Sequence, residues 1–200
     1  MNNSALHDHA EEGDPRAMTT LLTLGHGTLD VDALVALLRD AGVRRLVDVR
    51  RFPGSRRDPS VGRDSLGERL PAAGVDYRWE ERLGGRRRVP KDQPEADRWW
   101  RVTAFRAYAA HTRTAEFRAA MRQLLEEAAE ARTAVMCSET LWWRCHRRIV
   151  SDAVVLLHGV DVQHLGHDGR LTRHPPAEGA RVAGDGLRYD LAPPARSDSP

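Results

Sequence analysis

Hydrophobic residues along the chain fall into two kinds of pattern. Short apolar runs, of the length and composition typical of buried strands, occupy residues 20–24, 44–49, 75–79, 133–136 and 160–165. The segments between these runs carry apolar residues at the spacing of one helical face, which predicts helices at residues 28–41, 66–74, 99–108, 114–128 and 144–158. The clearest helical face consists of Phe117, Met121, Leu124, Leu125 and Ala128.

Strands that alternate with helices indicate a mainly parallel sheet, because each crossover helix covers one face of the sheet. We therefore predict a single three-layer α/β domain of Rossmann-like character, with a mainly parallel sheet of about five strands. This domain spans residues 19–174. Residues 1–18 are polar and aperiodic, and residues 175–200 are rich in Pro, Gly, Asp, Ser and Arg, so we expect a disordered leader and a disordered tail.

Length and composition agree with this architecture. The 200 residues, of which 40% are hydrophobic, suffice for one domain with one sizeable core. A formal net charge of +2 does not mark the whole molecule as a nucleic-acid binder. Arginines nevertheless gather beside Gly-rich turns, where they suit carboxylate or phosphate groups. A genomic bias toward arginine explains why Lys91 is the only lysine, but it does not explain this clustering.

The expected location follows from what the chain lacks. No stretch approaches the roughly 18 apolar residues of a membrane helix, and the acidic N-terminal segment does not resemble a signal peptide. We therefore expect a cytoplasmic protein with no membrane contact. In that compartment Cys137 and Cys145 are expected as thiols, which favours catalytic, redox or metal-binding roles over a structural disulfide.

Residues 134–157 hold the densest set of reactive side chains. Cys137 and Glu139 follow a predicted strand, and Cys145 and His146 precede the next helix. A thiol beside a helix N-terminus and arginines is biased toward the thiolate. We predict Cys137 as the nucleophile or redox thiol, with a carboxylate and an imidazole as acid or base. The catalytic candidates are Cys137, Glu139, His26, Cys145 and His146.

Other uses of the same residues stay open. Cys145 shares a helical face with Ile149 and Ala153, so it can equally be a small buried hydrophobic residue. The two cysteines do not form the Cys-x-x-Cys redox pattern, which weakens a disulfide cycle. Zinc or iron could bind at a cluster of soft and borderline ligands, although no pair has a recognised metal-ligand spacing. Those ligands are Cys137, Cys145, His146 and His26. We predict no cofactor.

Polar residues also follow the other predicted strands. Asp48 and Arg50 would bind a ribose and a phosphate, or would simply pair with each other at the strand end. His26 lies between two glycines, where no core packing requires an imidazole. Trp142 would stack on a base or another flat ligand. The predicted substrate-binding residues are Asp48, Arg50, Ser55, Tyr77, Gly84, Gly85, Arg86, Arg147 and Trp142.

Several motifs together resemble a known bacterial family. TLGHGT near the start, VDVRRFPGS after the second strand, Tyr77 followed by LGG, FRAYA, and CSE before CHRR resemble the family filed as domain of unknown function 488. The resemblance covers about Thr20 to Leu165. It implies a small cytoplasmic α/β protein with a site built from these motifs, and it implies no reaction. The family's usual turn reads Gly-His-Ser, so a hydroxyl at Gly27 is dispensable here or its role has moved to Thr28.

The leading functional hypothesis is an enzyme that acts on a phosphate-bearing or otherwise anionic small molecule, such as a nucleotide. The first alternative is a non-catalytic module that binds nucleic acid or a partner protein through arginines and tryptophans. The second alternative is the Cys/His metal site. The oligomeric state cannot be read from the sequence.

Overall fold

The computed structural model describes residues 19–54, 58–89, 96–184 and 186–190. Its centre is a six-stranded sheet with the order β3-β2-β4-β1-β5-β6. The first five strands in this order are parallel, and β6 runs antiparallel to β5. The strands are β1 (Thr20–Gly25), β2 (Arg45–Asp48), β3 (Asp76–Trp79), β4 (Thr133–Cys137), β5 (Asp161–Leu165) and β6 (Leu171–Arg173).

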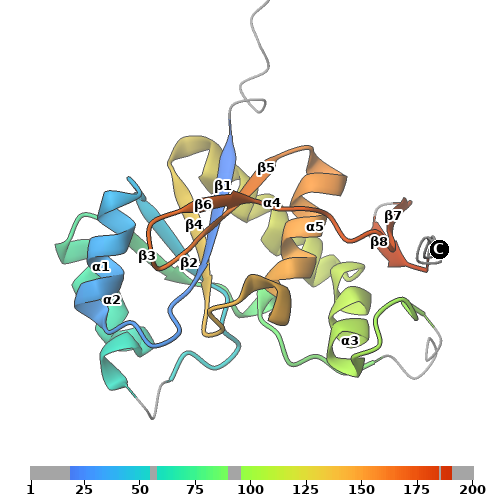
Figure 1. Ribbon diagram of the computed structural model, residues 1–200, viewed down its shortest axis with the longest axis horizontal. Coiled ribbons are helices and arrows are strands. Elements are labelled where there is room, and N and C mark those ends of the chain that lie inside the picture. The colour runs from blue at the N-terminus through green and yellow to red at the C-terminus, as the bar shows by residue number, and fades with distance from the viewer. Residues whose placement is uncertain (1–18, 55–57, 90–95, 185, 191–200) are drawn as a thin grey trace, which may run out of the picture.

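Helices cover both faces of this sheet, as Figure 1 shows. One face packs on α1 (Val31–Asp40) and α2 (Arg63–Ala72). The other face packs on α3 (Thr103–Thr112), α4 (Ala115–Glu130) and α5 (Arg147–His158). Successive side chains of a strand point to opposite faces, so Leu22 and Leu24 of β1 join the first core, and Leu21 joins the second. The predicted three-layer α/β architecture with a mainly parallel sheet is confirmed.

Helix starts agree only partly with the prediction. Thr114 caps α4 as expected, since its hydroxyl accepts a hydrogen bond from the amide of Phe117 at 3.2 Å. The first helix, predicted from residue 28, begins only at Val31. Asp30 directly precedes α1 and accepts from the amide of Ala33 at 2.8 Å, and a carboxylate there is also favoured by the helix dipole.

The last helix begins later than the apolar spacing predicts. Trp142–Arg144 form a 3-10 turn, called η4, and α5 starts only at Arg147. Cys145 lies between them in an extended conformation, with φ −125° and ψ 156°. Its backbone is therefore not helical, as the spacing with Ile149 assumed, but its side chain is 6% exposed and belongs to the same buried cluster as Ile149, as the alternative predicted.

The segment after β6 corrects another expectation. Residues predicted to form an unpacked tail include a hairpin of β7 (Ala180–Ala183) and β8 (Gly186–Tyr189). Leu187 and Tyr189 are completely buried, and the ring of Tyr189 lies 5.2 Å from that of Trp100. The segment is rich in Pro and Gly, which predicted a tail without packing, but Leu187 and Tyr189 complete the core beside α3 and α5. The expected leader and residues 191–200 lie outside the described residues.

Chain topology places a crevice at the end of β4. Gly25 of β1 and Cys137 of β4 are register partners at the carboxyl ends of adjacent strands. The chain leaves β1 toward α1 on one face and leaves β4 toward α5 on the other face. Such a switch point opens a space between the two departing loops, and ligands of open α/β sheets bind there. Among the described residues, no helix combines the length and apolar character needed to cross a membrane.

Replacement of the buried C-terminal anchor, Tyr189→Ala, is expected to lower the free energy of unfolding by about 3–5 kcal/mol, because a large aromatic side chain leaves a cavity. Urea denaturation measures this change. Val182→Ala in the same hairpin is the control, since Val182 is 51% exposed, and it should change stability by less than about 0.5 kcal/mol. Equal effects of the two substitutions would show that the hairpin is not part of the core.

Candidate functional site

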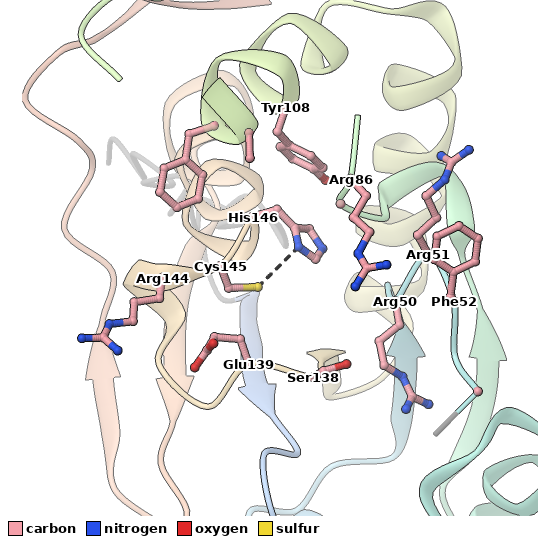
Figure 2. A pocket seen from close by; sticks show the side chains of 14 residues that line it. Arg50, Arg51, Phe52, Arg86, Tyr108, Ser138, Glu139, Arg144, Cys145 and His146 are labelled. Carbon is pink, nitrogen blue, oxygen red and sulfur yellow. Dashed lines mark hydrogen bonds between the residues drawn. The ribbon is translucent and has the colours of Figure 1, made fainter. Parts of the chain in front are cut away.

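A cleft of about 740 Å³ lies beyond the carboxyl ends of β2, β3 and β4. Figure 2 shows Cys145 and His146 at its centre, with Arg144 on one side and Arg50, Arg51 and Arg86 on the other. The cleft is therefore strongly basic at its rim and carries a thiol in its middle. Its remaining lining side chains are aromatic or polar and include Phe52, Phe105, Tyr108, Ser138 and Glu139.

The two cysteines are in direct contact. The sulfur atoms of Cys137 and Cys145 lie 2.7 Å apart, and both are free cysteines. Both thiols are buried, with Cys137 2% and Cys145 6% exposed. Of the two, Cys145 is the one whose side chain lines the cleft.

Arg147 holds this pair from behind. Its Nε donates to the sulfur of Cys137 at 3.2 Å, and its backbone amide donates to the sulfur of Cys145 at 3.5 Å. The remaining guanidinium hydrogen bonds go to the carbonyl oxygens of Glu139 and Thr140 and to the hydroxyl of Thr23. The side chain is 1% exposed and forms no ion pair with a described carboxylate. A buried cation with no carboxylate beside it favours an anion nearby.

The proton shared by the two thiols is placed by these contacts. Burial alone would raise the pKa of Cys145, but the hydrogen bond from Cys137 and the charge of Arg147 together lower it to about 7. Burial and the adjacent sulfur raise the pKa of Cys137 well above its ordinary value. These opposite shifts favour the proton on Cys137 and the thiolate on Cys145. This arrangement favours Cys145, and not Cys137, as the nucleophile.

His146 faces the thiolate from the cleft wall. Its Nδ1 lies 3.4 Å from the sulfur of Cys145, and its ring packs against Tyr108 with 5.0 Å between ring centroids. Burial lowers the pKa of His146, so the imidazole is neutral near pH 7. Gly85 allows this approach, because a Cβ at that position would lie 2.9 Å from Nδ1 of His146.

The Gly-His-Gly turn packs directly on the loop after β4. A Cβ on Gly25 would lie 1.8 Å from the carbonyl oxygen of Glu139, and one on Gly27 would lie 2.1 Å from the hydroxyl of Thr140. Gly27 also has a φ of 55°. A serine at this position would therefore collide with Thr140, which explains why the turn departs from Gly-His-Ser. Thr28 is exposed and caps no helix.

Asp48 and Arg50 form the ion pair that was the alternative to ligand binding. The guanidinium of Arg50 donates to both carboxylate oxygens of Asp48, the shortest contact being 2.6 Å. The Tyr77 hydroxyl donates to the same carboxylate at 2.9 Å. Asp48 is completely buried. Arg50 lines the cleft, whereas Asp48 and Tyr77 do not.

His26 lies behind Arg50 and does not line the cleft. Its Nε2 is 3.3 Å from a guanidinium nitrogen of Arg50. Burial and the positive charge of Arg50 lower the pKa of His26 to about 4. The imidazole is neutral at physiological pH and lies beside the Asp48–Arg50 pair. The imidazole of His26 is not grouped with the thiols and His146, although the backbone amide of His26 donates to the carbonyl oxygen of Cys137 at 3.0 Å.

The other predicted residues divide between cleft and scaffold. Glu139, Gly85 and Arg86 line the cleft, and Glu139 is exposed there. Gly84 and Arg147 are buried behind it. Trp142 was predicted to stack on a ligand, but His164 already stacks on one face of its ring, with 4.2 Å between ring centroids. Ser55 lies outside the described residues.

Some cleft residues escaped the sequence analysis. Arg51, Phe52 and Tyr108 lie inside the quoted motifs RRFPG and FRAYA, and Arg144 lies between Trp143 and Cys145. The motifs marked the right segments. They did not indicate which side chain of each segment points into the cleft, because that depends on how the loops pack.

Metal binding fits these residues poorly. Cys137, Cys145 and His146 offer ligand atoms within 4.8 Å of one another, and they are the group with this property among the described residues. His26 does not belong to it. Two thiolates on a tetrahedral zinc with bonds of about 2.3 Å lie about 3.8 Å apart, whereas these sulfurs are 2.7 Å apart. The pair would have to separate by about 1 Å to hold a metal.

Comparison with models of protein families matches residues 30–154, more than half of the chain, to "Domain of unknown function DUF488". Neither the curated proteins nor the solved structures gave a match. The matched segment contains the cysteine pair, His146, Arg147 and the arginines at the cleft rim. The resemblance noted from the motifs is confirmed, and the chain belongs to the DUF488 family.

Proposed function

We propose that this protein is a thiol-dependent enzyme that acts on an anionic, phosphate-bearing small molecule such as a nucleotide. The observation that carries the proposal is the position of the Cys145 sulfur. It lies in the middle of an arginine-lined cleft, against a thiol donor and a buried arginine that together favour the thiolate. A thiolate, and not a thiol, is the reactive nucleophile.

The chemical roles follow from the positions. Arg51, Arg86 and Arg144 bind the negative groups of the substrate, since planar guanidinium groups match phosphate geometry. The thiolate of Cys145 attacks an electrophilic carbon or phosphorus atom, the bond to the leaving group breaks, and the leaving group takes its proton from water. Glu139 and the neutral His146 line the cleft wall and act as bases toward the water that then releases the product from Cys145.

A flat substrate group is supported by an aromatic side chain at the rim. Phe52 is 64% exposed, although a solvent-exposed phenyl ring is unfavourable. The guanidinium carbons of Arg51 and Arg86 lie 5.9 and 5.8 Å from its ring centroid. A base stacked on this ring would place its phosphate among the flanking arginines. This combination favours a nucleotide over a simple anion.

Alkylation of Cys145 by iodoacetamide is expected to follow a titration near pH 7, lower than the ordinary thiol value of about 8.5. The rate rises with pH because the thiolate is the reacting form. In Cys137→Ala the midpoint should rise by about one pH unit, because the thiolate loses a hydrogen-bond donor. Mass spectrometry of each cysteine peptide gives the rates. A midpoint near 8.5 in the unaltered protein would refute the proposal.

Phe52→Ala is expected to weaken binding of adenosine monophosphate about tenfold, because base stacking on an aromatic ring is lost. Affinity for ribose 5-phosphate should stay unchanged in this variant, whereas Arg86→Ala should weaken both ligands. Isothermal titration calorimetry measures the affinities, with Leu171→Ala on β6 as an exposed control outside the cleft. Equal losses for both ligands in Phe52→Ala would argue against a stacked base.

The contact between the sulfurs supports a second candidate, a dithiol redox function. Cys145 thiolate would attack a small-molecule disulfide and release one thiol, and Cys137 would then attack the mixed disulfide and release the second. The protein would form a disulfide, and its two electrons and two protons would pass to the small-molecule disulfide, which leaves as two thiols. Treatment with glutathione disulfide tests this step: a mass loss of two hydrogen atoms per chain supports it, and a stable mixed disulfide excludes it.

Two further alternatives are tested by the same preparations. A binding module would bind single-stranded oligonucleotide in a salt-sensitive way that Cys145→Ala leaves unchanged, while Cys145 shows an ordinary pKa. A zinc or iron site would give one metal ion per chain in elemental analysis, with loss of the metal in Cys145→Ala.

A further inference from the structure

A relay of buried polar side chains runs from Arg147 away from the cleft and consists of Thr23, His164, His174 and Asp152. Its guanidinium lies 3.4 Å from the hydroxyl of Thr23 on β1, which lies 2.7 Å from Nδ1 of His164 on β5. The other ring nitrogen of His164 lies 3.0 Å from Nδ1 of His174. The remaining nitrogen of His174 lies 2.8 Å from the carboxylate of Asp152 on α5. Each of these side chains is at most 5% exposed.

The two ends of the relay, Arg147 and Asp152, determine the direction of its hydrogen bonds. Arg147 can only donate, and the carboxylate of Asp152 accepts, since it also receives the backbone amide of Ala177 at 3.0 Å and the hydroxyl of Tyr189 at 2.9 Å. With both rings neutral, His174 therefore donates from Nε2 and accepts at Nδ1, and His164 does the same.

The hydroxyl at the other end completes this order. Thr23 donates to His164, which leaves an oxygen lone pair to accept from Arg147. Burial is the main cause that lowers the pKa of His164 to about 3. This ring therefore stays neutral at physiological pH, as the order of the hydrogen bonds requires.

The relay also supports the η4 turn, which is followed directly by Cys145. Trp142 stacks flat on His164, with ring centroids 4.2 Å apart and planes 8° apart. The carbonyl oxygen of Trp142 accepts from the amide of Cys145 at 3.2 Å. The same imidazole thus contacts both the link to Arg147 and the η4 turn that ends at Cys145.

We propose that His164, His174 and Asp152 are positioning residues for the cysteine pair: their ordered hydrogen bonds hold Arg147 against Cys137 and so maintain the thiolate at Cys145. The proposal rests on the proposed function, because it concerns the same thiolate. None of the three lines the cleft. If His164 took the opposite tautomer, Thr23 would accept from both His164 and Arg147, and its own hydroxyl hydrogen would have no partner among the described residues.

The test measures the pH midpoint of Cys145 alkylation in relay variants. Thr23→Val and His174→Gln should raise the midpoint by about one pH unit, because each breaks the link to Arg147. Asparagine places its amide near the Nδ1 position of histidine, so His174→Asn keeps the acceptor for His164 and should stay within a few tenths of a unit of the unaltered protein.

Matched controls separate this effect from a general loss of structure. Glu80→Gln alters an equally buried carboxylate that pairs with Arg78 and Arg82, far from the relay in the sheet order, and should not move the midpoint. The charged or titratable groups that face the sulfurs are Arg147, His146 and Tyr108, and they are unchanged in every variant. Unmoved midpoints in folded Thr23→Val and His174→Gln would overturn the proposal.

A second measurement needs no variant. Long-range ¹H–¹⁵N NMR of the unaltered protein reports imidazole tautomers directly, and both His164 and His174 should carry the proton on Nε2. A proton on Nδ1 of either ring would overturn the relay even if Cys145 has a low pKa. Conversely, correct tautomers with an ordinary Cys145 pKa would refute the proposed thiol function, and with it the positioning role, while leaving the hydrogen-bond order intact.

Discussion

The burial of the Arg147 guanidinium is the constraint on which the candidate site depends. A desolvated cation that pairs with no described carboxylate must have its charge balanced through dipoles and polarizable groups. Two carbonyl oxygens, a hydroxyl and a thiol surround it. The nearest group that can become an anion is the cysteine pair, so the same burial that makes Arg147 costly stabilises a thiolate at Cys145. The anchoring of the loop after β4 and the lowered pKa of Cys145 thus have one origin.

The sheet topology supplies everything that this arrangement requires. The parallel pairing of β1 with β4 brings the glycine turn against Glu139 and Thr140, where no Cβ would fit. The loop therefore lies against Arg147, and the carbonyl oxygens of Glu139 and Thr140 accept hydrogen bonds from its guanidinium. Parallel pairing of β1 with β5 sets Thr23 beside His164 on the face that carries α5. Neither contact could form if adjacent strands slipped by one residue, because the side chains would change faces.

Much of the fold and part of the site could be predicted from the sequence. The alternation of apolar runs and helical faces depends on periodicity, and the end of α5 at Gly159 depends on a local backbone preference. The clustering of arginines near strand ends can be read directly from the order of residues. The two segments around Cys137 and Cys145 were likewise identified by composition. The packing of the C-terminal hairpin was not predictable in this way, since Leu187 and Tyr189 gain their burial from helices distant in sequence.

By itself, then, the sequence determined the α/β class, the segments that meet at the sheet edge and the residue types available for chemistry there. The tertiary structure decided which cysteine faces the cleft, that Asp48 and Arg50 pair with each other, and that the imidazole of His26 lies beside Arg50. It also joined Asp152 to Arg147 through His164 and His174. The physical reason is that protonation and accessibility depend on burial and on hydrogen-bond partners, and these come from strands and helices that only folding brings into contact.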